Sequence, residues 1–437
     1  MMQSLPSSAA ERVQLMTLDP GHFHAALVQK FMYPTVDPVV YVYAPDGPDL
    51  DLHLQRIEGF NTRADDPTSW DMRVYRGDDF ADKMFADRPG NVVVLSGNNA
   101  KKTEYILRCV QEGLNVLADK PMVITPDELP LLQQAFEEAA EQKVLLYDIM
   151  TERYEITTIL QRRLSQIPAL FGELQRGSAD RPAVTKESVH HFAKQVAGKP
   201  LIRPAWFFDV TQEGEGIVDV TTHLVDLIQW ECFPGESLKP SDVKMVSARR
   251  WPTVLTPKQF EQVTGLKEYP DYLKSIVNAD GNLEVYCNGE FVYTLRGVHA
   301  KVSVIWNFEA PKGAGDTHYS IMRGSKADLV IRQGAEQNYK PTLYVESKAL
   351  TKKELEDQVH AAIDSLQGDY PGLAAKEHER GWEIAIPDAL RVGHEAHFAQ
   401  VTGAYLNYLA DGKLPDWEVP NMLVKYYTIM EAYKASR

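Results

Sequence analysis

The sequence places one lysine where it could act on a substrate oxygen. Lys120 follows the predicted strand Asn115–Leu117 and stands between Asp119 and Pro121. A residue before proline is pushed toward extended geometry, and ligands bind at the carboxyl edge of a parallel sheet. A lysine held there can donate a hydrogen bond to a hydroxyl or carbonyl oxygen and relay a proton. A solvated surface lysine is the alternative reading.

An aspartate and a histidine form a second group of residues that could take part in catalysis. Gly214 and Gly216 open a predicted helix in which Asp219 and His223 are four residues apart, so that they share one face with Asp226. An aspartate can fix the tautomer of an imidazole and leave its other nitrogen free as an acid or base. A purely structural hydrogen bond remains open, and a zinc site would have two ligands with no evident third.

The turn after the first predicted strand, Val13–Leu18, lies where a dinucleotide would bind. Such a turn needs glycines that admit a pyrophosphate, followed by a helix whose first N–H groups face it. The predicted helix is Ala25–Phe31, and the turn between has a single glycine, so an ordinary βα turn is the alternative. The turn consists of Asp19, Pro20, Gly21, His22, Phe23 and His24.

An acidic residue after the second predicted strand, Val39–Tyr43, could bind the adenosine ribose. Asp46 is the nearest candidate, although it follows Pro45 in a segment that also reads as a plain turn.

Other motifs are absent from the sequence. His394 and His397 are one residue short of the H-E-x-x-H spacing of zinc proteases, and neither a serine-hydrolase elbow nor a P-loop occurs. The three cysteines, at positions 109, 232 and 287, form no C-x-x-C pair. We therefore predict no metal.

The order of the predicted elements indicates an α/β fold. In the first 150 residues short apolar strands alternate with helices, which is typical of a doubly wound parallel sheet. Its further elements are the strands Asn91–Leu95 and Val144–Tyr147 and the helices Lys101–Gln111 and Asp127–Gln142.

From about residue 170, β-rich runs follow one another without helices, which predicts a mostly antiparallel sheet. We therefore expect two domains, 1–150 and 151–437, with the option that the C-terminal helices, about 388–437, pack back on the first. The predicted strands are Val243–Ala248, Leu283–Tyr286, Val292–Arg296, Lys301–Phe308 and Ala327–Ile331, and the predicted helices are 350–366, 388–410 and Val424–Lys434.

Composition excludes several classes of protein. With 44% hydrophobic and 24% charged residues, the 437-residue chain is neither collagen-like, coiled-coil nor disordered. A net charge of −15 disfavours nucleic-acid and membrane partners. No apolar run approaches the ~18 residues of a membrane span. Met1–Ala10 lacks the basic start and apolar stretch of a secretory leader, so we expect the cytoplasm, with the periplasm open if a leader has been trimmed.

Taken together, these segments resemble the Gfo/Idh/MocA oxidoreductases. Gly113–Pro121 is similar to the family's "aGkhVl.EKP", with Asp119 in place of Glu, and Gly214–Trp230 is similar to "G-G-G-x-x-x-D-x-G-x-H-x-x-D-x-x-x-W". Val144–Tyr154 and Leu170–Leu174 resemble the crossover into the second domain, and Arg323–Ala327 a family turn. The likeness covers most of residues 12–233.

The resemblance implies an N-terminal Rossmann domain, a C-terminal domain with an open antiparallel sheet, and a tightly held NAD or NADP. Asp46 favours NAD, because it would repel a 2′-phosphate. By position, Lys120, Asp219 and His223 match the catalytic residues, and these three with Arg153 and Tyr154 would bind substrate. The expected cofactor residues are Asp19, Pro20, Gly21, His22, Phe23, His24, Asp46, Ser96, Gly97, Asn98, Asn99, Lys102, Asp119, Lys120 and Pro121.

The sequence departs from the family pattern at two places. Leu18, Pro20 and Phe23 stand at or near the glycine positions, and Lys102 stands where a histidine is typical. We expect an NAD(P)-dependent oxidoreductase that takes hydride from a secondary hydroxyl of a sugar, cyclitol or glycoside, working as a homodimer or homotetramer. Glycoside cleavage or epimerisation without net redox change, and a non-catalytic nucleotide- or sugar-binding relative, are the alternatives.

Overall fold

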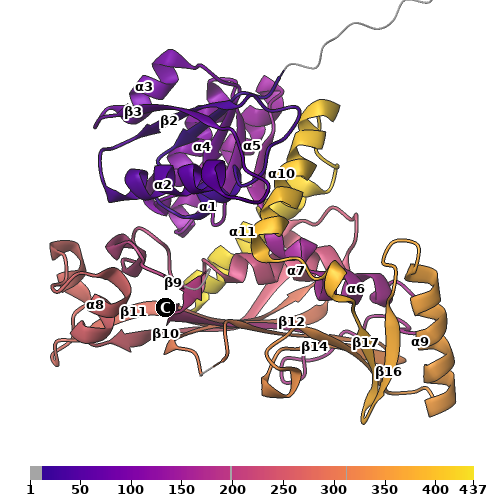
Figure 1. Cartoon of the computed structure of the whole chain (residues 1–437). Coiled ribbons are helices and arrows are strands. Elements are labelled where there is room, and N and C mark those ends of the chain that lie inside the picture. Colours follow the sequence, from indigo (N-terminus) through magenta and orange to yellow (C-terminus); the bar gives the residue numbers. More distant parts are fainter. Residues whose placement is uncertain (1–11, 197–198, 312) are drawn as a thin grey trace, which may run out of the picture. The chain divides into compact units, whose positions relative to one another are not determined.

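The computed structural model describes residues 12–196, 199–311 and 313–437, which fold into two compact units (Figure 1). Unit 1 comprises Met1–Asp119, Gln133–Ile149 and Phe398–Leu414, and unit 2 comprises Lys120–Leu132, Met150–His397 and Pro415–Arg437. The chain thus leaves unit 1 at Lys120, the lysine singled out above, and returns to it twice.

Unit 1 is built on a parallel sheet, as predicted. Its strand order is β3-β2-β1-β4-β5-β6, and every neighbouring pair runs parallel. The order changes direction between β1 and β4, which is where such sheets bind ligands. The strands are β1 Leu15–Leu18, β2 Val39–Ala44, β3 Asp71–Arg76, β4 Val92–Leu95, β5 Asn115–Asp119 and β6 Leu146–Ile149.

Helices connect these strands, and the first of them is shorter than predicted. The helix expected at Ala25–Phe31 is limited to α1, His24–Leu27. The sequence reading also missed β3, because this edge strand is largely exposed and carries three charged residues among six. The helices on either side of it, α2 and α3, were missed as well. The remaining helices are α2 Pro48–Thr62, α3 Phe80–Asp87, α4 Lys102–Gln111, α5 Leu129–Gln142 and α10 His394–Asp411, with 3-10 turns η1 Asn99–Lys101 and η2 Pro126–Glu128.

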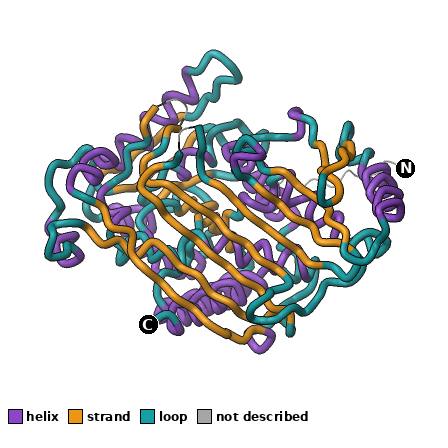
Figure 2. The backbone as a smooth tube through the Cα atoms, turned by 90° about the horizontal axis from the view of Figure 1, so that it is seen from below, coloured by secondary structure: helices purple, strands orange, loops and turns teal. Residues whose placement is uncertain are grey.

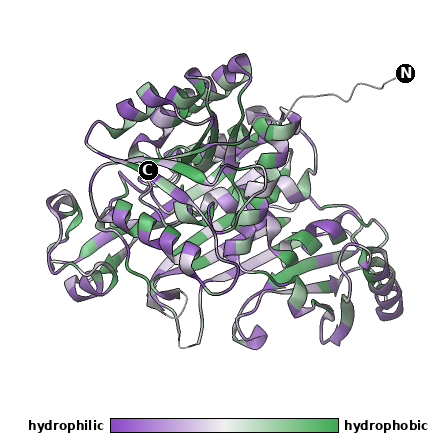
Figure 3. Ribbon diagram, turned by 45° about the horizontal axis from the view of Figure 1, so that its top comes forward, coloured by the Kyte–Doolittle hydropathy of each residue, from purple (hydrophilic) through white to green (hydrophobic). Residues whose placement is uncertain are grey.

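The core of unit 1 lies along the central strands. All four residues of β1 and all four of β4 are buried, as expected for strands covered on both faces. Figure 3 shows hydrophobic residues along the strands and hydrophilic ones on the outward turns of the helices. Tyr405 of α10 stacks on Tyr147 of β6 with ring centroids 6.0 Å apart, which attaches α10 to the sheet.

Unit 2 is built on a nine-stranded sheet, whose long strands lie side by side in Figure 2. The order is β10-β11-β12-β7-β13-β14-β15-β17-β16, and only the pair β12 and β7 runs parallel. The prediction of a mostly antiparallel sheet is therefore confirmed. Its strands are β7 Val184–Ala193, β10 Val243–Leu255, β11 Leu283–Leu295, β12 Val298–Glu309, β13 Thr317–Arg323, β14 Ala327–Arg332, β15 Thr342–Ser347, β16 Ala374–His378 and β17 Gly381–Ala385.

The two strands predicted at Leu283–Tyr286 and Val292–Arg296 are one continuous strand, β11. The Asn288-Gly289 step between them resembles a hairpin turn in sequence. In the fold, Asn288 Nδ2 donates to the carbonyl of Trp251 at a bulge of β10, 3.0 Å away. A Cβ on Gly289 would come within 2.5 Å of Ile217 Cβ, so this glycine permits close packing.

The other elements of unit 2 are helices, short turns and the two-stranded antiparallel sheet of β8 and β9. They are η3 Thr151–Tyr154, α6 Ile156–Ser165, β8 Gln195–Val196, β9 Lys199–Pro200, η4 Ala205–Phe208, α7 Thr221–Cys232, η5 Pro240–Asp242, α8 Pro257–Thr264, η6 Asp271–Ile276, η7 Ala335–Gln337, α9 Lys352–Leu366, η8 Asp388–Leu390 and α11 Glu418–Ala435. A fully buried ion pair joins β7 to α7, with Lys186 Nζ 2.6 Å from Glu231 Oε1. Among the residues just described, no helix is long and apolar enough to cross a membrane.

Candidate active site

Unit 2 brings together two of the residues predicted to act in catalysis. The ammonium of Lys120, directly after β5, donates a hydrogen bond to the carboxylate of Asp219, 99 residues further along the chain. Both side chains are nearly buried, with 12% and 8% of their surface exposed. The peptide bond between Lys120 and Pro121 is cis. A lysine held this firmly by one carboxylate oxygen is a positioned donor, whereas a surface lysine would be mobile.

The helix expected to carry both Asp219 and His223 begins later than predicted. α7 starts at Thr221, and Asp219 lies in the turn before it, with its N–H donating to the carbonyl of Glu215 at 3.0 Å. The reason is the packing of this segment against β11. A Cβ on Gly216 would lie 1.6 Å from the carbonyl oxygen of Cys287, and the N–H of Gly216 donates to the carbonyl of Tyr286 at 3.0 Å, so this backbone is bonded to the strand.

His223 occupies the first turn of α7. Its neighbours Thr221, Thr222 and Leu224 are buried, while His223 itself is partly exposed. The imidazole is therefore the polar side chain that the start of this helix presents at the surface of unit 2, four residues after Asp219.

Glu152 is a residue of this region that the sequence reading missed. It lies in η3 and is partly exposed, and its carboxylate has no hydrogen bond or ion pair with any residue that the structure describes. Burial, followed by the negative charge of Glu155, raises its pKa to about 7, and the positive charge of Lys120 opposes that shift. No motif in the sequence marks this position, because its neighbour Lys120 is 32 residues away.

Arg153 was expected to bind substrate together with Tyr154. Its guanidinium is buried and forms two hydrogen bonds with Asp226, at 2.6 and 2.7 Å, and one with Glu418 at 2.7 Å. Lys425 also donates to Asp226, at 3.0 Å. Both cations lower the pKa of Asp226 despite its burial. These contacts tie η3 to α7 and α11, while Tyr154 beside Arg153 is partly buried.

The proposed cofactor turn lies in unit 1, at the point where the strand order changes direction. The turn is tied to the end of β4, since the N–H of His22 donates to the carbonyl of Ser96 at 3.2 Å. Asp19 adopts a left-handed conformation with φ 51°. A Cβ on Gly97 would lie 1.9 Å from the carbonyl oxygen of Asp19. Burial raises the pKa of Asp19 to about 6, with a further contribution from Asp49 that Lys101 opposes. Gly97 is thus required by the close approach of two loops.

A polar network surrounds Asp119 at the end of β5. Its Oδ2 accepts hydrogen bonds from His24 Nδ1 and Ser96 Oγ, both at 2.9 Å, and lies 3.7 Å from His22 Nδ1. Lys102 Nζ donates to the carbonyl of Asp119 at 3.0 Å. The histidines and Lys102 hold the pKa of Asp119 well below its usual value, against the effect of burial.

One ligand atom from each of His22, His24 and Asp119 lies within 4.8 Å of the others, so that these residues could also hold a metal ion. Asp119 Oδ2 already has two donors, and the ammonium of Lys102 lies beside it. We therefore interpret the cluster as a hydrogen-bonded network.

Three further predicted cofactor residues of unit 1 are Asn98, Asn99 and Asp46. Asn98 caps η1 by accepting from the N–H of Ala100 at 2.9 Å, and Asn99 is buried. Asp46, beyond β2, is exposed and pairs with Arg76 at 2.8 Å.

The residues present fit an anionic dinucleotide by donor type. Imidazoles follow the carboxyl end of β1 and the amides of Asn98 and Asn99 follow that of β4, whereas the Ser96 hydroxyl already donates to Asp119. α1 has only four residues and therefore supplies little of the helix dipole that normally faces a pyrophosphate. Side chains and loop amides would have to take over that role.

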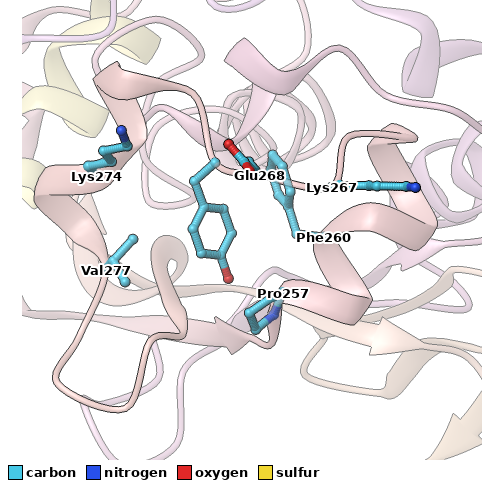
Figure 4. A pocket seen from close by; sticks show the side chains of 7 residues that line it. Pro257, Phe260, Lys267, Glu268, Lys274 and Val277 are labelled. Atoms are coloured by element: carbon cyan, nitrogen blue, oxygen red, sulfur yellow. The ribbon is translucent and has the colours of Figure 1, made fainter.

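Unit 2 also has an open pocket of about 570 Å³ beside α8 and η6, shown in Figure 4. Tyr269 forms part of its wall and donates from its hydroxyl to the carbonyls of Leu255 and Gly281, at 3.3 and 3.4 Å. The other lining residues are Pro257, Phe260, Lys267, Glu268, Lys274 and Val277. None of the predicted site residues lines it, so we do not include it in the active site.

Comparison with known proteins identifies relatives of the whole chain. The family described as "Putative oxidoreductase C terminal domain" matches residues 160–437. A solved structure described as a "putative oxidoreductase", from Parabacteroides merdae, is 56% identical, covers 98% of each chain and superposes with a TM-score of 0.95. The search of curated proteins gave no match.

More distant structures share the fold. Levoglucosan dehydrogenase, in complex with NADH and levoglucosan, is 12% identical over 97% of each chain, with a TM-score of 0.60. A 3-ketoreductase from Actinomadura kijaniata, in complex with NADP and TDP-benzene, is 13% identical over 95% of each chain, with a TM-score of 0.54.

Proposed function

We propose that this chain oxidises a secondary hydroxyl of a sugar, cyclitol or glycoside with NAD or NADP. The proposal starts from its family, since the chain belongs to the Gfo/Idh/MocA-type oxidoreductases. The observation that carries the proposal is the Lys120–Asp219 pair, nearly buried and followed four residues later by the partly exposed His223. An ammonium and a carboxylate can bind and polarise an alcohol, and an imidazole four residues after the carboxylate can deprotonate it.

Each of the three residues has a separate part in this chemistry. Lys120 donates a hydrogen bond to the reacting hydroxyl oxygen and stabilises the negative charge that develops there. Asp219 fixes the position of the Lys120 ammonium and is available to a neighbouring hydroxyl. His223 accepts the hydroxyl proton. Proton transfer by such a positioned group typically contributes about 10²–10⁴-fold in rate.

The nicotinamide, when bound, supplies the hydride acceptor. In unit 1, the turn from Asp19 to His24 would hold its pyrophosphate, and Ser96 to Asn99 would lie along the nicotinamide ribose. We propose NAD as the preferred form, because the carboxylate of Asp46 repels a 2′-phosphate. The pairing of Asp46 with Arg76 weakens that repulsion, so titration with both nucleotides decides the preference.

The substrate class is proposed from the two ligand-bound relatives. One is a levoglucosan dehydrogenase and the other a 3-ketoreductase, and both are held in complex with a nicotinamide nucleotide. A neutral polyol is also compatible with the lysine, carboxylate and imidazole of unit 2, each of which can hydrogen-bond a hydroxyl group.

The experiment that tests the proposal begins with the nucleotide. The purified protein is denatured, any released nucleotide is identified by mass spectrometry, and NAD and NADP are titrated onto the protein. Turnover is then measured on a panel of sugars and cyclitols for the native chain, Lys120→Ala and His223→Ala, with the exposed Lys258→Ala as the matched control.

We expect nucleotide binding, turnover reduced by at least 100-fold in the first two variants, and unchanged turnover in the control. Equal turnover in all four proteins would refute the assigned roles. Nucleotide binding without turnover on any sugar would instead favour a binding protein. Release of sugar without free NADH would favour redox-neutral glycoside cleavage.

A further inference from the structure

A second cavity of unit 2, of about 620 Å³, has Glu152 of η3 in its wall. Its volume falls within the roughly 300–1,000 Å³ that is usual for small-molecule sites. The wall is formed by η3, the first turn of α6, the start of β13, the β14–β15 connection and the stretch from η8 into α10. The lining residues are Glu152, Glu155, Thr157, Thr158, Asp316, His318, Gln333, Lys340, Pro341, Asp388, Arg391, Val392, His394 and His397.

Charged residues in the wall of the cavity interact electrostatically with Lys120 and, through His190, with Asp219. Glu152 lies within electrostatic range of Lys120. Another wall residue, Asp316, pairs with His190 Nδ1 at 3.3 Å, and the charge of Asp219 in turn acts on His190. Glu152 also directly precedes Arg153, whose guanidinium donates to Asp226 of α7, the helix that carries His223, so this wall is tied to that helix.

Some polar groups in the wall of the cavity are hydrogen-bonded within the fold, and others have no described hydrogen-bond partner. Gln333 is fully engaged, since its Oε1 accepts from the N–H of His318 at 2.8 Å and its Nε2 donates to the carbonyl of Asp316 at 3.2 Å. By contrast, His318 Nε2 is buried and, like the carboxylate of Glu152, lacks a hydrogen-bond partner among the described residues. Partly buried polar groups are normally paired, so a ligand in the cavity is a natural partner for the partly exposed carboxylate of Glu152.

The chemistry of the lining selects a neutral, hydroxyl-rich ligand. Pro341 and Val392 are the apolar members of the wall, and the others offer hydrogen-bond donors or acceptors. The carboxylates of Glu152, Glu155, Asp316 and Asp388 outnumber the cationic side chains of Lys340 and Arg391, which disfavours an anion. Burial lowers the pKa of His318 to about 3 and that of His397 to about 4, so that neither imidazole adds positive charge near neutral pH.

We propose that this cavity is a subsite for a second sugar unit, attached to the ring that carries the reacting hydroxyl, and that Glu152 binds a hydroxyl of that unit. The natural substrate is then a neutral disaccharide or a larger glycoside, and a free monosaccharide is a poor substrate. The inference rests on the proposed oxidation at Lys120 and adds the part of the substrate beyond the reacting ring.

The test compares a monosaccharide and its methyl glycoside with disaccharides that contain the same glucose unit. kcat/KM is measured on glucose, methyl β-glucoside, cellobiose, maltose and lactose for the native chain, Glu152→Gln and Val392→Trp. Val392 is 45% exposed at the cavity, so tryptophan there fills the subsite without removing a polar group. Val254, 46% exposed on β10 and outside the cavity, provides the matched control Val254→Trp.

We expect at least one disaccharide to exceed its monosaccharide by 10-fold or more in kcat/KM. That ratio falls by at least 10-fold in Val392→Trp and Glu152→Gln and is unchanged in Val254→Trp. Glu152→Gln also removes a group with a pKa near 7 from the pH profile for the disaccharide. A ratio near one in the native chain, or a ratio that the cavity variants do not change, would overturn the subsite.

Calorimetric titration of the same sugars separates this inference from the proposed function. Disaccharide binding that is lost in Val392→Trp, with no turnover by any protein, would reject the oxidation and retain the subsite. Absence of disaccharide binding in the native chain would reject the subsite.

Discussion

Replacing Gly97 with alanine should separate the two loops that form the proposed cofactor site. The added Cβ would lie 1.9 Å from the carbonyl oxygen of Asp19 and 2.8 Å from the N–H nitrogen of Gly21. Both are backbone atoms, so no flexible side chain can move aside. The turn is also held by the hydrogen bond from His22 N–H to the carbonyl of Ser96, at 3.2 Å, and the methyl group must strain that bond.

The cost of such overpacking is typically about 1–3 kcal/mol. For a unit of this size each kcal/mol corresponds to a fall of about 2–4 °C in Tm. Gly59, within α2, supplies the matched control, because no atom lies within 4 Å of its Cβ position. Gly59→Ala should stabilise the same unit by about 0.5–1 kcal/mol, since glycine is unfavourable inside a helix.

Thermal melts and NAD titrations of Gly97→Ala, Gly59→Ala and the native chain test this reasoning. We expect a lower Tm and at least 10-fold weaker nucleotide binding for Gly97→Ala, and neither effect for Gly59→Ala. If Gly97→Ala keeps both the native Tm and the native affinity, the turn and the β4 loop are not in the close contact described above.

Three further predictions concern stability and metal dependence. His53 is buried without a described hydrogen-bond partner for its ring, and burial lowers its pKa to about 3. Between pH ~6.5 and ~3 only the unfolded chain therefore binds a proton at this site, so the free energy of unfolding falls as the pH drops through that window. In urea titrations at pH 7 and pH 4, His53→Leu should lose about 3 kcal/mol less unfolding free energy than the native chain. Lys186→Met leaves the buried Glu231 unpaired and should lower the free energy of unfolding in denaturant by about 3–5 kcal/mol. The double variant Lys186→Met/Glu231→Leu should recover most of that loss. Equal losses in both variants would argue against the pair. Because the carboxylate of Asp119 is already hydrogen-bonded, dialysis against EDTA should leave turnover unchanged, and a loss restored by added Zn²⁺ would show that His22, His24 and Asp119 hold a metal.

The architecture of both sheets could be predicted from the sequence because it depends on apolar runs. The fully buried β4, with its Val-Val-Val-Leu sequence, is identified by composition alone. β3 was missed since an exposed edge strand has no apolar pattern. β11 was divided in two because Asn288-Gly289 has the composition of a turn, and only the partner strand shows that Asn288 bridges a bulge.

The candidate site was partly accessible from the sequence. Motif spacing predicted Lys120, Asp219 and His223 as site residues, and the structure pairs Lys120 with Asp219. The spacing placed Asp219 on the helix, because the packing of Gly216 on β11 cannot be read from spacing. Glu152, and the association of Asp119 with His24 across 95 residues, arise from tertiary contacts that carry no local signal. Where chemistry depends on distant segments, the fold has to be known first.

The most direct test of the account follows a labelled hydride. Sugars deuterated at their ring carbons are incubated with the protein and oxidised NAD or NADP, and the recovered nucleotide is analysed by mass spectrometry for the native chain and for Lys120→Met. We expect deuterium in the reduced nicotinamide with the native chain and at least 100-fold slower labelling with Lys120→Met. No transfer from any sugar, or equal transfer by the two proteins, would contradict it.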